Sequence, residues 1–122
     1  MEGGTRILLV DDEPLLLTSI RRVLARVRPN AVVVYASSAD AAEWQLRCTT
    51  LKLVVTDMRM QADPRAGIRV VRAARDANVP VAIMTSVDPV ELDGLVGEDV
   101  EILSKGEMTV ERLTKLVERA FS

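Results

Sequence analysis

The chain has 122 residues, of which 48% are hydrophobic and 28% are charged, and this balance predicts one globular domain over residues 1–122. A formal net charge of −2 and the lack of any apolar run near roughly 20 residues exclude a general affinity for nucleic acid or for a membrane. Histidine is absent and cysteine occurs once, as Cys48, which excludes histidine-based catalysis, an internal disulfide and the usual zinc ligand sets.

Short apolar runs rich in β-branched residues alternate along the chain with segments whose apolar residues recur at helical spacing. Pro, Ser and Thr residues stand near the ends of several of these segments and favour helix boundaries there. In chain order, the predicted elements are strand 7–10, a helix between Pro14 and Pro29, strand 31–35, helix 39–46, strand 51–55, helix 68–74, strand 79–84, a short helix 89–96, strand 100–103 and helix 113–120 after Thr109.

The regular alternation of strand and helix predicts an α/β fold. Because the strands read as buried apolar runs, we expect a parallel sheet with helices covering both of its faces. Ligands of such sheets bind outside the carboxyl ends of the strands, where the strand order reverses. The residues directly after each predicted strand are therefore the candidate functional residues.

Acidic residues follow two of the predicted strands, and a hydroxyl group and an ammonium group follow two others. Asp57 precedes a segment that is not yet helical, so its carboxylate is not needed as a helix cap. Asp12, taken alone, fits a helix cap as well as it fits a functional site. Lys105 is one of three lysines beside thirteen arginines, and its compact charge suits a phosphate oxygen. The candidates are Asp11, Asp12 and Glu13 after residues 7–10, Asp57 after 51–55, Thr85 and Ser86 after 79–84, and Lys105 after 100–103.

If the first and third strands are neighbours, Asp11, Asp12 and Asp57 converge in one crevice. Carboxylates at such short range cannot all stay ionised without a cation. Oxygen ligands of this kind suit Mg²⁺, which commonly completes its coordination with water and a phosphate. A bound ion would favour phosphoryl transfer to a carboxylate nucleophile, with Lys105 and the Thr85 hydroxyl engaging the remaining phosphoryl oxygens.

Four stretches of the chain resemble bacterial two-component response-regulator receiver domains: ILLVDDEP, VVTDMRM, VAIMTS and LSK. The resemblance covers nearly the whole chain and implies a flavodoxin-like, doubly wound, five-stranded parallel sheet with strand order 2-1-3-4-5. It implies that Asp57 accepts a phosphoryl group and that Thr85 and Lys105 bind that group. The implied Mg²⁺ ligands are Asp11 or Asp12, Asp57 and the backbone carbonyl of Arg59.

The resemblance also implies a place in a phosphorelay. The phosphoryl donor would be a sensor histidine kinase or a histidine phosphotransfer protein, which receivers meet on the first helix, here with Arg21 and Arg22. An output protein would bind the face formed by helix 89–96, strand 100–103 and the last helix. The domain would not be an enzyme for external substrates, and would catalyse only its own phosphorylation and dephosphorylation. The lack of a secretory signal at the start of the chain predicts a cytoplasmic location.

The chain departs from the receiver pattern at three places. Ile102 stands where receivers usually carry an aromatic residue. Gly106 replaces the proline that usually follows the lysine, which predicts a trans peptide bond between Lys105 and Gly106. The segment 61–66 delays the glycine that usually follows the phosphoacceptor closely. Because a β-branched side chain cannot swing as an aromatic one does, helix 89–96 becomes the candidate for transmitting phosphorylation.

Other functions stay open on the residues alone. A pseudo-receiver would keep the fold and act as a phosphorylation-independent interaction module, an alternative that the three departures keep open. A small Mg²⁺-dependent phosphatase also uses an aspartate nucleophile, but it needs a second acid two residues later, where Arg59 follows Asp57. A flavin-binding domain of the same topology is weaker still, because the acidic residues 11–13 would repel its phosphate.

Overall fold

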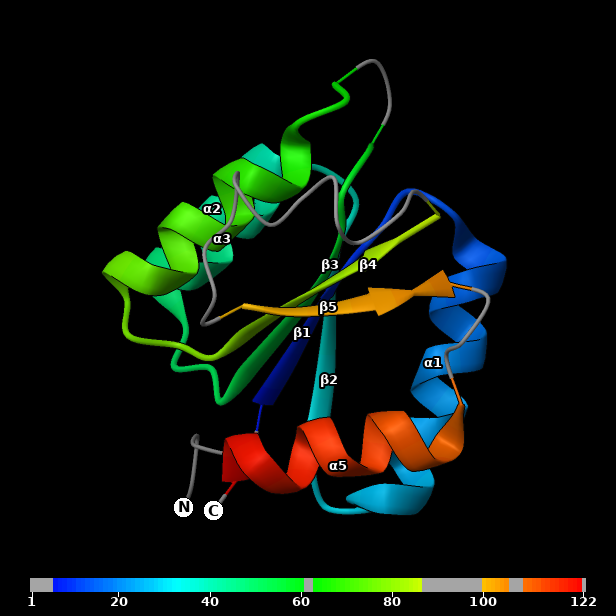
Figure 1. Cartoon of the computed structure of the whole chain (residues 1–122). Helices are drawn as coiled ribbons and strands as arrows, with labels where there is room; N and C mark the ends of the chain where they lie inside the picture. Colours follow the sequence, from blue (N-terminus) through cyan, green and yellow to red (C-terminus); the bar gives the residue numbers. More distant parts are fainter. Residues whose placement is uncertain (1–5, 61–62, 87–99, 106–108, 122) are drawn as a thin grey trace.

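The sheet has the predicted parallel, doubly wound topology. The computed structural model describes residues 6–60, 63–86, 100–105 and 109–121. Five strands form one sheet in the order β2-β1-β3-β4-β5, and every neighbouring pair is parallel (Figure 1). The strands are β1 (Arg6–Val10), β2 (Val32–Ala36), β3 (Leu53–Asp57), β4 (Val81–Thr85) and β5 (Glu101–Ser104). The flavodoxin-like fold expected from the sequence is confirmed.

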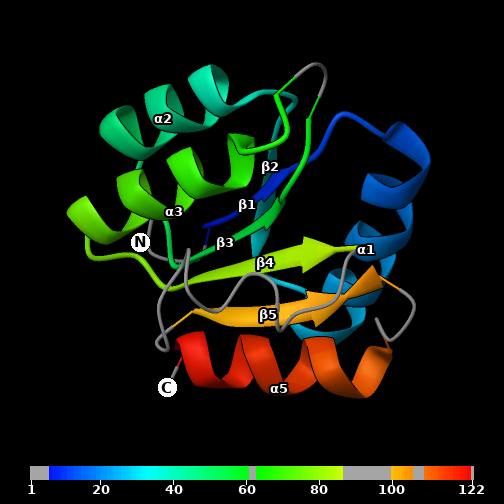
Figure 2. The same ribbon diagram turned by 45° about the horizontal axis from the view of Figure 1, so that its top comes forward.

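Helices cover both faces of the sheet. The described helices are α1 (Pro14–Val27), α2 (Ala39–Cys48), α3 (Ala66–Asp76) and α5 (Val110–Phe121). α2 and α3 lie together on one face, and α1 and α5 lie on the other (Figure 2). The helix predicted over residues 89–96 and the peptide bond before Gly106 lie outside the described residues. Within the described ranges, no helix is both long enough and apolar enough to cross a membrane.

Consecutive strand residues belong to two apolar cores, one on each face of the sheet. Val54 of β3 packs into the core beneath α2 and α3, whereas Val55 packs into the core beneath α1 and α5. The first core includes Leu8, Ala42, Val71 and Ile83, and the second includes Leu9, Leu24, Met84 and Leu113. Full burial of one large aliphatic side chain contributes about 1.5–3 kcal/mol. The two cores therefore hold the central strands rigidly between the helix layers.

β1 begins one residue earlier than predicted and ends at the predicted residue, whereas the other four strands begin and end later than predicted. Asp57 and Thr85 are the last residues of β3 and β4, whereas the sequence placed both of them after a strand. The ladder continues this far because Asp57 lies opposite Met84, and the Met58 N–H donates to the Met84 carbonyl at 3.1 Å. The candidate side chains of β3 and β4 therefore project from rigid strand positions and not from a loop.

The prediction that every strand is buried is wrong for β2. This strand lies at one edge of the sheet and pairs only with β1. Its residues Val32 and Tyr35 are 52% and 40% exposed. An edge strand lacks a neighbour on one side, so its side chains receive less cover from the helix layers. The run of β-branched residues thus predicted the strand correctly but not its burial.

Polar residues mark the starts of several helices. Ser38 accepts a backbone N–H from the first turn of α2 at 3.1 Å, and Thr109 accepts one at the start of α5 at 3.1 Å, as the sequence predicted. The N-cap of α1 is Glu13 and not Asp12, and the Glu13 side chain makes no capping hydrogen bond. The Glu13 carboxylate is therefore left for other contacts.

Gly67 sets the distance between the start of α3 and the end of β3. Its N–H donates to the Met58 carbonyl at 2.9 Å. A Cβ atom at this position would lie 2.7 Å from the Asp57 carbonyl oxygen and 2.8 Å from the Met58 Cα. Both are backbone atoms, which cannot move aside as the end of a flexible side chain can. The close approach of α3 to Asp57 therefore requires a residue without a side chain.

We predict that Gly67→Ala lowers the free energy of unfolding by about 2 kcal/mol, because overpacking against backbone outweighs the roughly 1 kcal/mol gained from alanine's helix propensity. Urea denaturation measures the change. Arg72→Ala, at an exposed position of the same helix, is the control and should alter stability by less than about 0.5 kcal/mol. A Gly67→Ala variant as stable as the wild type would contradict the close approach.

Candidate functional site

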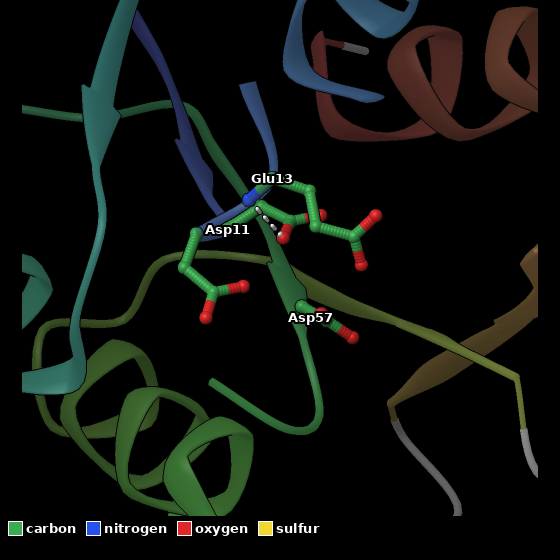
Figure 3. A group of neighbouring side chains, drawn as sticks. Asp11, Glu13 and Asp57 are labelled. Carbon is green, nitrogen blue, oxygen red and sulfur yellow. Dashed lines mark hydrogen bonds between the residues drawn. The ribbon is translucent and has the colours of Figure 1, made fainter. Parts of the chain in front are cut away.

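Four acidic side chains meet at the carboxyl edge of the sheet. β1 and β3 are neighbours, so Asp11, directly after β1, comes close to Asp57, at the end of β3. Asp11, Asp12, Glu13 and Asp57 each offer a carboxylate oxygen, and these oxygens all lie within 4.8 Å of one another. Figure 3 shows Asp11, Glu13 and Asp57 at this end of the strands. The sequence predicted the convergence of the three aspartates and named Glu13 among the candidates, but it predicted no contact for Glu13.

The Asp57 carboxylate is nearly buried and is held at both oxygens. Oδ1 accepts the backbone N–H of Met58 at 2.8 Å, and Oδ2 accepts the Lys105 ammonium at 3.1 Å. The hydroxyl of the preceding residue, Thr56, donates to the Asp57 carbonyl at 2.9 Å. The backbone around Asp57 thus fixes the direction of its side chain, with one carboxylate oxygen facing a cation.

Lys105 reaches the site from the end of β5, two strands away from β3. Its Nζ lies 3.1 Å from Asp57 Oδ2 and 3.4 Å from Glu13 Oε1. Partial burial lowers the pKa of Lys105, but the hydrogen bond and charge of Asp57, together with the charges of Asp11 and Glu13, outweigh burial and raise the pKa above its ordinary value. The lysine is therefore fully charged at neutral pH and bridges two carboxylates.

Asp11 is fully buried and only partly satisfied. Its Oδ1 accepts the backbone N–H of Glu13 at 3.0 Å, the hydrogen bond drawn in Figure 3. Its Oδ2 is buried and has no hydrogen-bond partner in the described part of the chain. Burial, with the charge of Asp57, raises the pKa of Asp11 to about 6 although the Glu13 N–H and the charge of Lys105 act in the opposite direction. An unsatisfied carboxylate oxygen among acidic neighbours fits a bound divalent cation.

Thr85 and Arg59 lie near Asp57 in the fold and in the sequence, respectively. Thr85 is buried at the end of β4, the strand next to β3, and therefore lies at the same edge of the sheet as Asp57. Arg59 is exposed in the segment that follows β3, two residues after Asp57. The structure thus brings Lys105 into contact with the acidic cluster, and it places Thr85 at the same edge of the sheet on the strand next to β3.

The longer loop after β3 closes on itself before α3 begins. Met60 and Asp63 exchange backbone hydrogen bonds of 3.1 and 3.0 Å. The Asp63 carboxylate also accepts the N–H of Arg65 at 2.9 Å, and Met60 is buried in the core beneath α2 and α3. These contacts join the described residues on the two sides of this segment shortly before α3 begins.

The arrangement has the parts needed for phosphoryl transfer to a carboxylate. Asp57 presents a carboxylate oxygen to an ammonium group, and Asp11 presents an unsatisfied oxygen from the adjacent strand. A cation held by the acidic cluster would offset its negative charge and that of an incoming phosphoryl group. An ammonium and a hydroxyl at the ends of neighbouring strands can contact the other phosphoryl oxygens.

Comparisons with known proteins agree on one family and one fold. The family model described as response regulator receiver domain matches residues 7–118. A response regulator receiver protein from Sinorhizobium medicae WSM419 is 29% identical, with a TM-score of 0.83 over 96% of this chain and 94% of that chain. The signal receiver domain of an HD domain-containing protein from Pseudomonas fluorescens Pf-5 shares the fold at 20% identity, with a TM-score of 0.78 over 97% and 94% of the two chains. No curated protein sequence matches the chain.

We predict that Asp11→Asn stabilises the domain at pH 7 when divalent cations are chelated. The pKa of Asp11 rises from 3.8 to about 6 in the fold, so above pH 6 the folded protein carries an ionised group that its surroundings disfavour. Asparagine keeps an acceptor for the Glu13 N–H without the charge, and we expect a gain of about 1–2 kcal/mol in the free energy of unfolding. Urea denaturation in a chelator measures it.

The pH dependence of the free energy of unfolding distinguishes removal of the Asp11 charge from improved packing as the cause of the stabilisation. Protonated Asp11 carries no charge, so the advantage of asparagine should disappear as the pH falls from 6 toward 3.8. Asp76→Asn, at the exposed end of α3, is the control and should change stability little at any pH. A less stable Asp11→Asn protein at pH 7 in chelator would show that the ionised carboxylate is well accommodated.

Proposed function

The chain belongs to the response regulator receiver family of two-component signalling, and we propose that it accepts a phosphoryl group on Asp57 in a Mg²⁺-dependent reaction. The position of Asp57 carries this proposal. Its carboxylate lies 3.1 Å from the Lys105 ammonium, within an acidic cluster whose oxygens come within 4.8 Å of one another. A phosphoryl group on Asp57 would therefore lie between an ammonium group and a cation-binding cluster.

Asp57 acts as the nucleophile. One of its carboxylate oxygens attacks the phosphorus of a phosphohistidine, the P–N bond breaks, and its electron pair returns to the imidazole of the donor. Oδ1 is engaged by the Met58 N–H while Oδ2 faces Lys105, so attack by Oδ2 puts the new phosphoryl group beside the ammonium. Lys105 and the Thr85 hydroxyl then contact phosphoryl oxygens and stabilise the charge that develops on them.

The residues that would hold Mg²⁺ are Asp11, Asp12, Asp57 and the backbone carbonyl of Arg59. The bound ion would neutralise the acidic cluster and the charge on the phosphoryl oxygens. Two observations support this assignment: Asp11 Oδ2 is buried without a partner in the described residues, and the pKa of Asp11 is raised to about 6. Both indicate a carboxylate that the protein alone does not satisfy.

The phosphoryl donor in this proposal is a sensor histidine kinase or a histidine phosphotransfer protein that docks on α1. Arg21 and Arg22 support it, because both are exposed on this helix. The output partner would bind the face that includes β5 and α5. The domain has no external substrate in this proposal and acts only on its own aspartyl phosphate.

We predict that acetyl phosphate with Mg²⁺ labels the domain with one phosphoryl group and that Asp57→Asn abolishes the label. The reason is that the buried Asp57 carboxylate lies 3.1 Å from the Lys105 ammonium, whereas the exposed Glu13 carboxylate lies 3.4 Å from it. Phosphate-affinity electrophoresis and intact mass measure the label, and chelation of Mg²⁺ should remove it. Asp76→Asn is the control, with unchanged labelling expected.

Labelling of Asp57→Asn at the wild-type rate would show that the phosphoacceptor is another residue. A folded wild-type protein that takes no label from acetyl phosphate or from any kinase would favour the phosphorylation-independent interaction module.

We predict that charge reversal of Arg21 and Arg22 slows phosphotransfer from a histidine kinase but not from acetyl phosphate. Removing positive charge from a docking face lowers the association rate, by about tenfold at low salt, and the difference should shrink as salt increases. Arg72→Glu on α3 is the matched control, because Arg72 is equally exposed on the other face of the sheet. Equal slowing with both donors would place the effect in the site and not in docking.

A further inference from the structure

Glu13 contacts the same ammonium group as the nucleophile. Lys105 Nζ lies 3.4 Å from Glu13 Oε1 and 3.1 Å from Asp57 Oδ2. The two acids differ in burial, since the side chain of Glu13 is 64% exposed and that of Asp57 is 7% exposed. Glu13 stands at the N-cap of α1 but makes no capping hydrogen bond, so Lys105 is the partner that its carboxylate has in the described structure.

The contact of Glu13 with Lys105 differs from an ordinary surface ion pair, because Asp57 contacts the same ammonium group. Glu111 and Lys115 on α5 form such an ordinary pair, with Nζ and Oε1 3.5 Å apart and both side chains exposed. A pair of that kind contributes little to stability, about 0–1 kcal/mol. Lys105 also contacts Asp57, so a change in the contact of Lys105 with Glu13 alters the interaction of Lys105 with Asp57.

Phosphorylation increases the negative charge that faces the Lys105 ammonium. Before it, Lys105 faces a carboxylate with one negative charge on Asp57. Afterwards it faces a phosphoryl group with about two negative charges, which binds an ammonium more strongly. A lysine still held by Glu13 cannot give its full charge to the phosphoryl oxygens, and the Glu13 carboxylate stays beside them as a like charge.

We propose that Glu13 is a positioning residue that holds Lys105 in the unphosphorylated state and must release it when a phosphoryl group forms on Asp57. This inference rests on the proposed function of Asp57. Glu13 thereby opposes retention of the phosphoryl group, and its removal strengthens the binding of a phosphoryl analogue. Glutamine at this position is the sharpest test, because it keeps the length of the side chain and an acceptor oxygen while it removes the charge.

Lysine NMR follows the contact directly. The 122-residue chain has three lysines, so this chain labelled with ¹³C at lysine Cε gives three signals, and Lys105→Met identifies that of Lys105. Beryllofluoride, which mimics a phosphoryl group on aspartate, is titrated at saturating Mg²⁺, so that a change in Mg²⁺ affinity does not enter. The proteins compared are the wild type, Glu13→Gln and the matched control Glu111→Gln, which changes the Lys115 pair instead.

Three results are expected. Without beryllofluoride, Glu13→Gln shifts the Lys105 signal and leaves those of Lys52 and Lys115 in place. At saturation the Lys105 signals of wild type and Glu13→Gln coincide, because Lys105 has left residue 13 in both. Glu13→Gln binds beryllofluoride about 3- to 10-fold more tightly than the wild type, whereas Glu111→Gln binds it equally.

The opposite outcomes have distinct meanings. A wild type that does not respond to beryllofluoride overturns the proposed function, and with it the role of Glu13. A wild type that responds, with unchanged or weaker binding in Glu13→Gln, overturns only the role of Glu13. So does a Lys105 signal that differs between the two saturated proteins as much as it does before titration, because the lysine would then still contact residue 13.

Discussion

The crowding of carboxylates around one ammonium group is the constraint on which this site depends. Parallel pairing of β1 with β3 brings Asp11 and Asp57 to the same edge of the sheet. Two like charges about 4 Å apart repel by roughly 4 kcal/mol at an effective dielectric constant near 20. Lys105 offsets part of this repulsion by bridging Asp57 and Glu13, but one oxygen of Asp11 stays unsatisfied within the described structure. A helix cap would not need such an excess of negative charge, whereas a bound cation would offset it and the charge of a phosphoryl group on Asp57.

The two cores keep this unfavourable arrangement in place. All five residues of β3 and all five of β4 are buried, so the strands that end at Asp57 and Thr85 cannot shift to relieve the repulsion. On one face, Arg69 of α3 forms ion pairs with Asp40 and Glu43 of α2, which join the two helices above the core. The close contact of α3 with the end of β3 limits movement further. The site is therefore strained by charge while its backbone is held by apolar packing.

The sequence predicted the fold and most of the site because local patterns decide both. Apolar runs and helical spacing depend on near neighbours, and the residues after buried strands of a parallel sheet must meet at one edge. The exposure of β2 was missed although the expected strand order places this strand at an edge, because the apolar composition of the run alone predicts burial. The contact of Glu13 was missed because its partner Lys105 lies 92 residues away along the chain, and no local signal separates Glu13 from an acidic residue at a helix start. The acidic run at residues 11–13, directly before a proline, was the only available hint.

Lys105 is also the point at which a change at Asp57 can reach the rest of the fold. It follows β5 directly, and β5 is joined to β4 by a parallel ladder and to α5 by the ion pair of Glu101 with Arg119, at 2.9 Å. Ile102 on the same strand is partly buried against the core beneath α2 and α3, and its β-branched side chain has restricted rotamers. A phosphoryl group shifts a conformational equilibrium only through contacts that differ between the two states. Under the proposed role of Glu13, Lys105 would meet this condition, because its ammonium is shared between two acids. In that case transmission would start at the end of β5 and would not need rotation of a side chain within that strand.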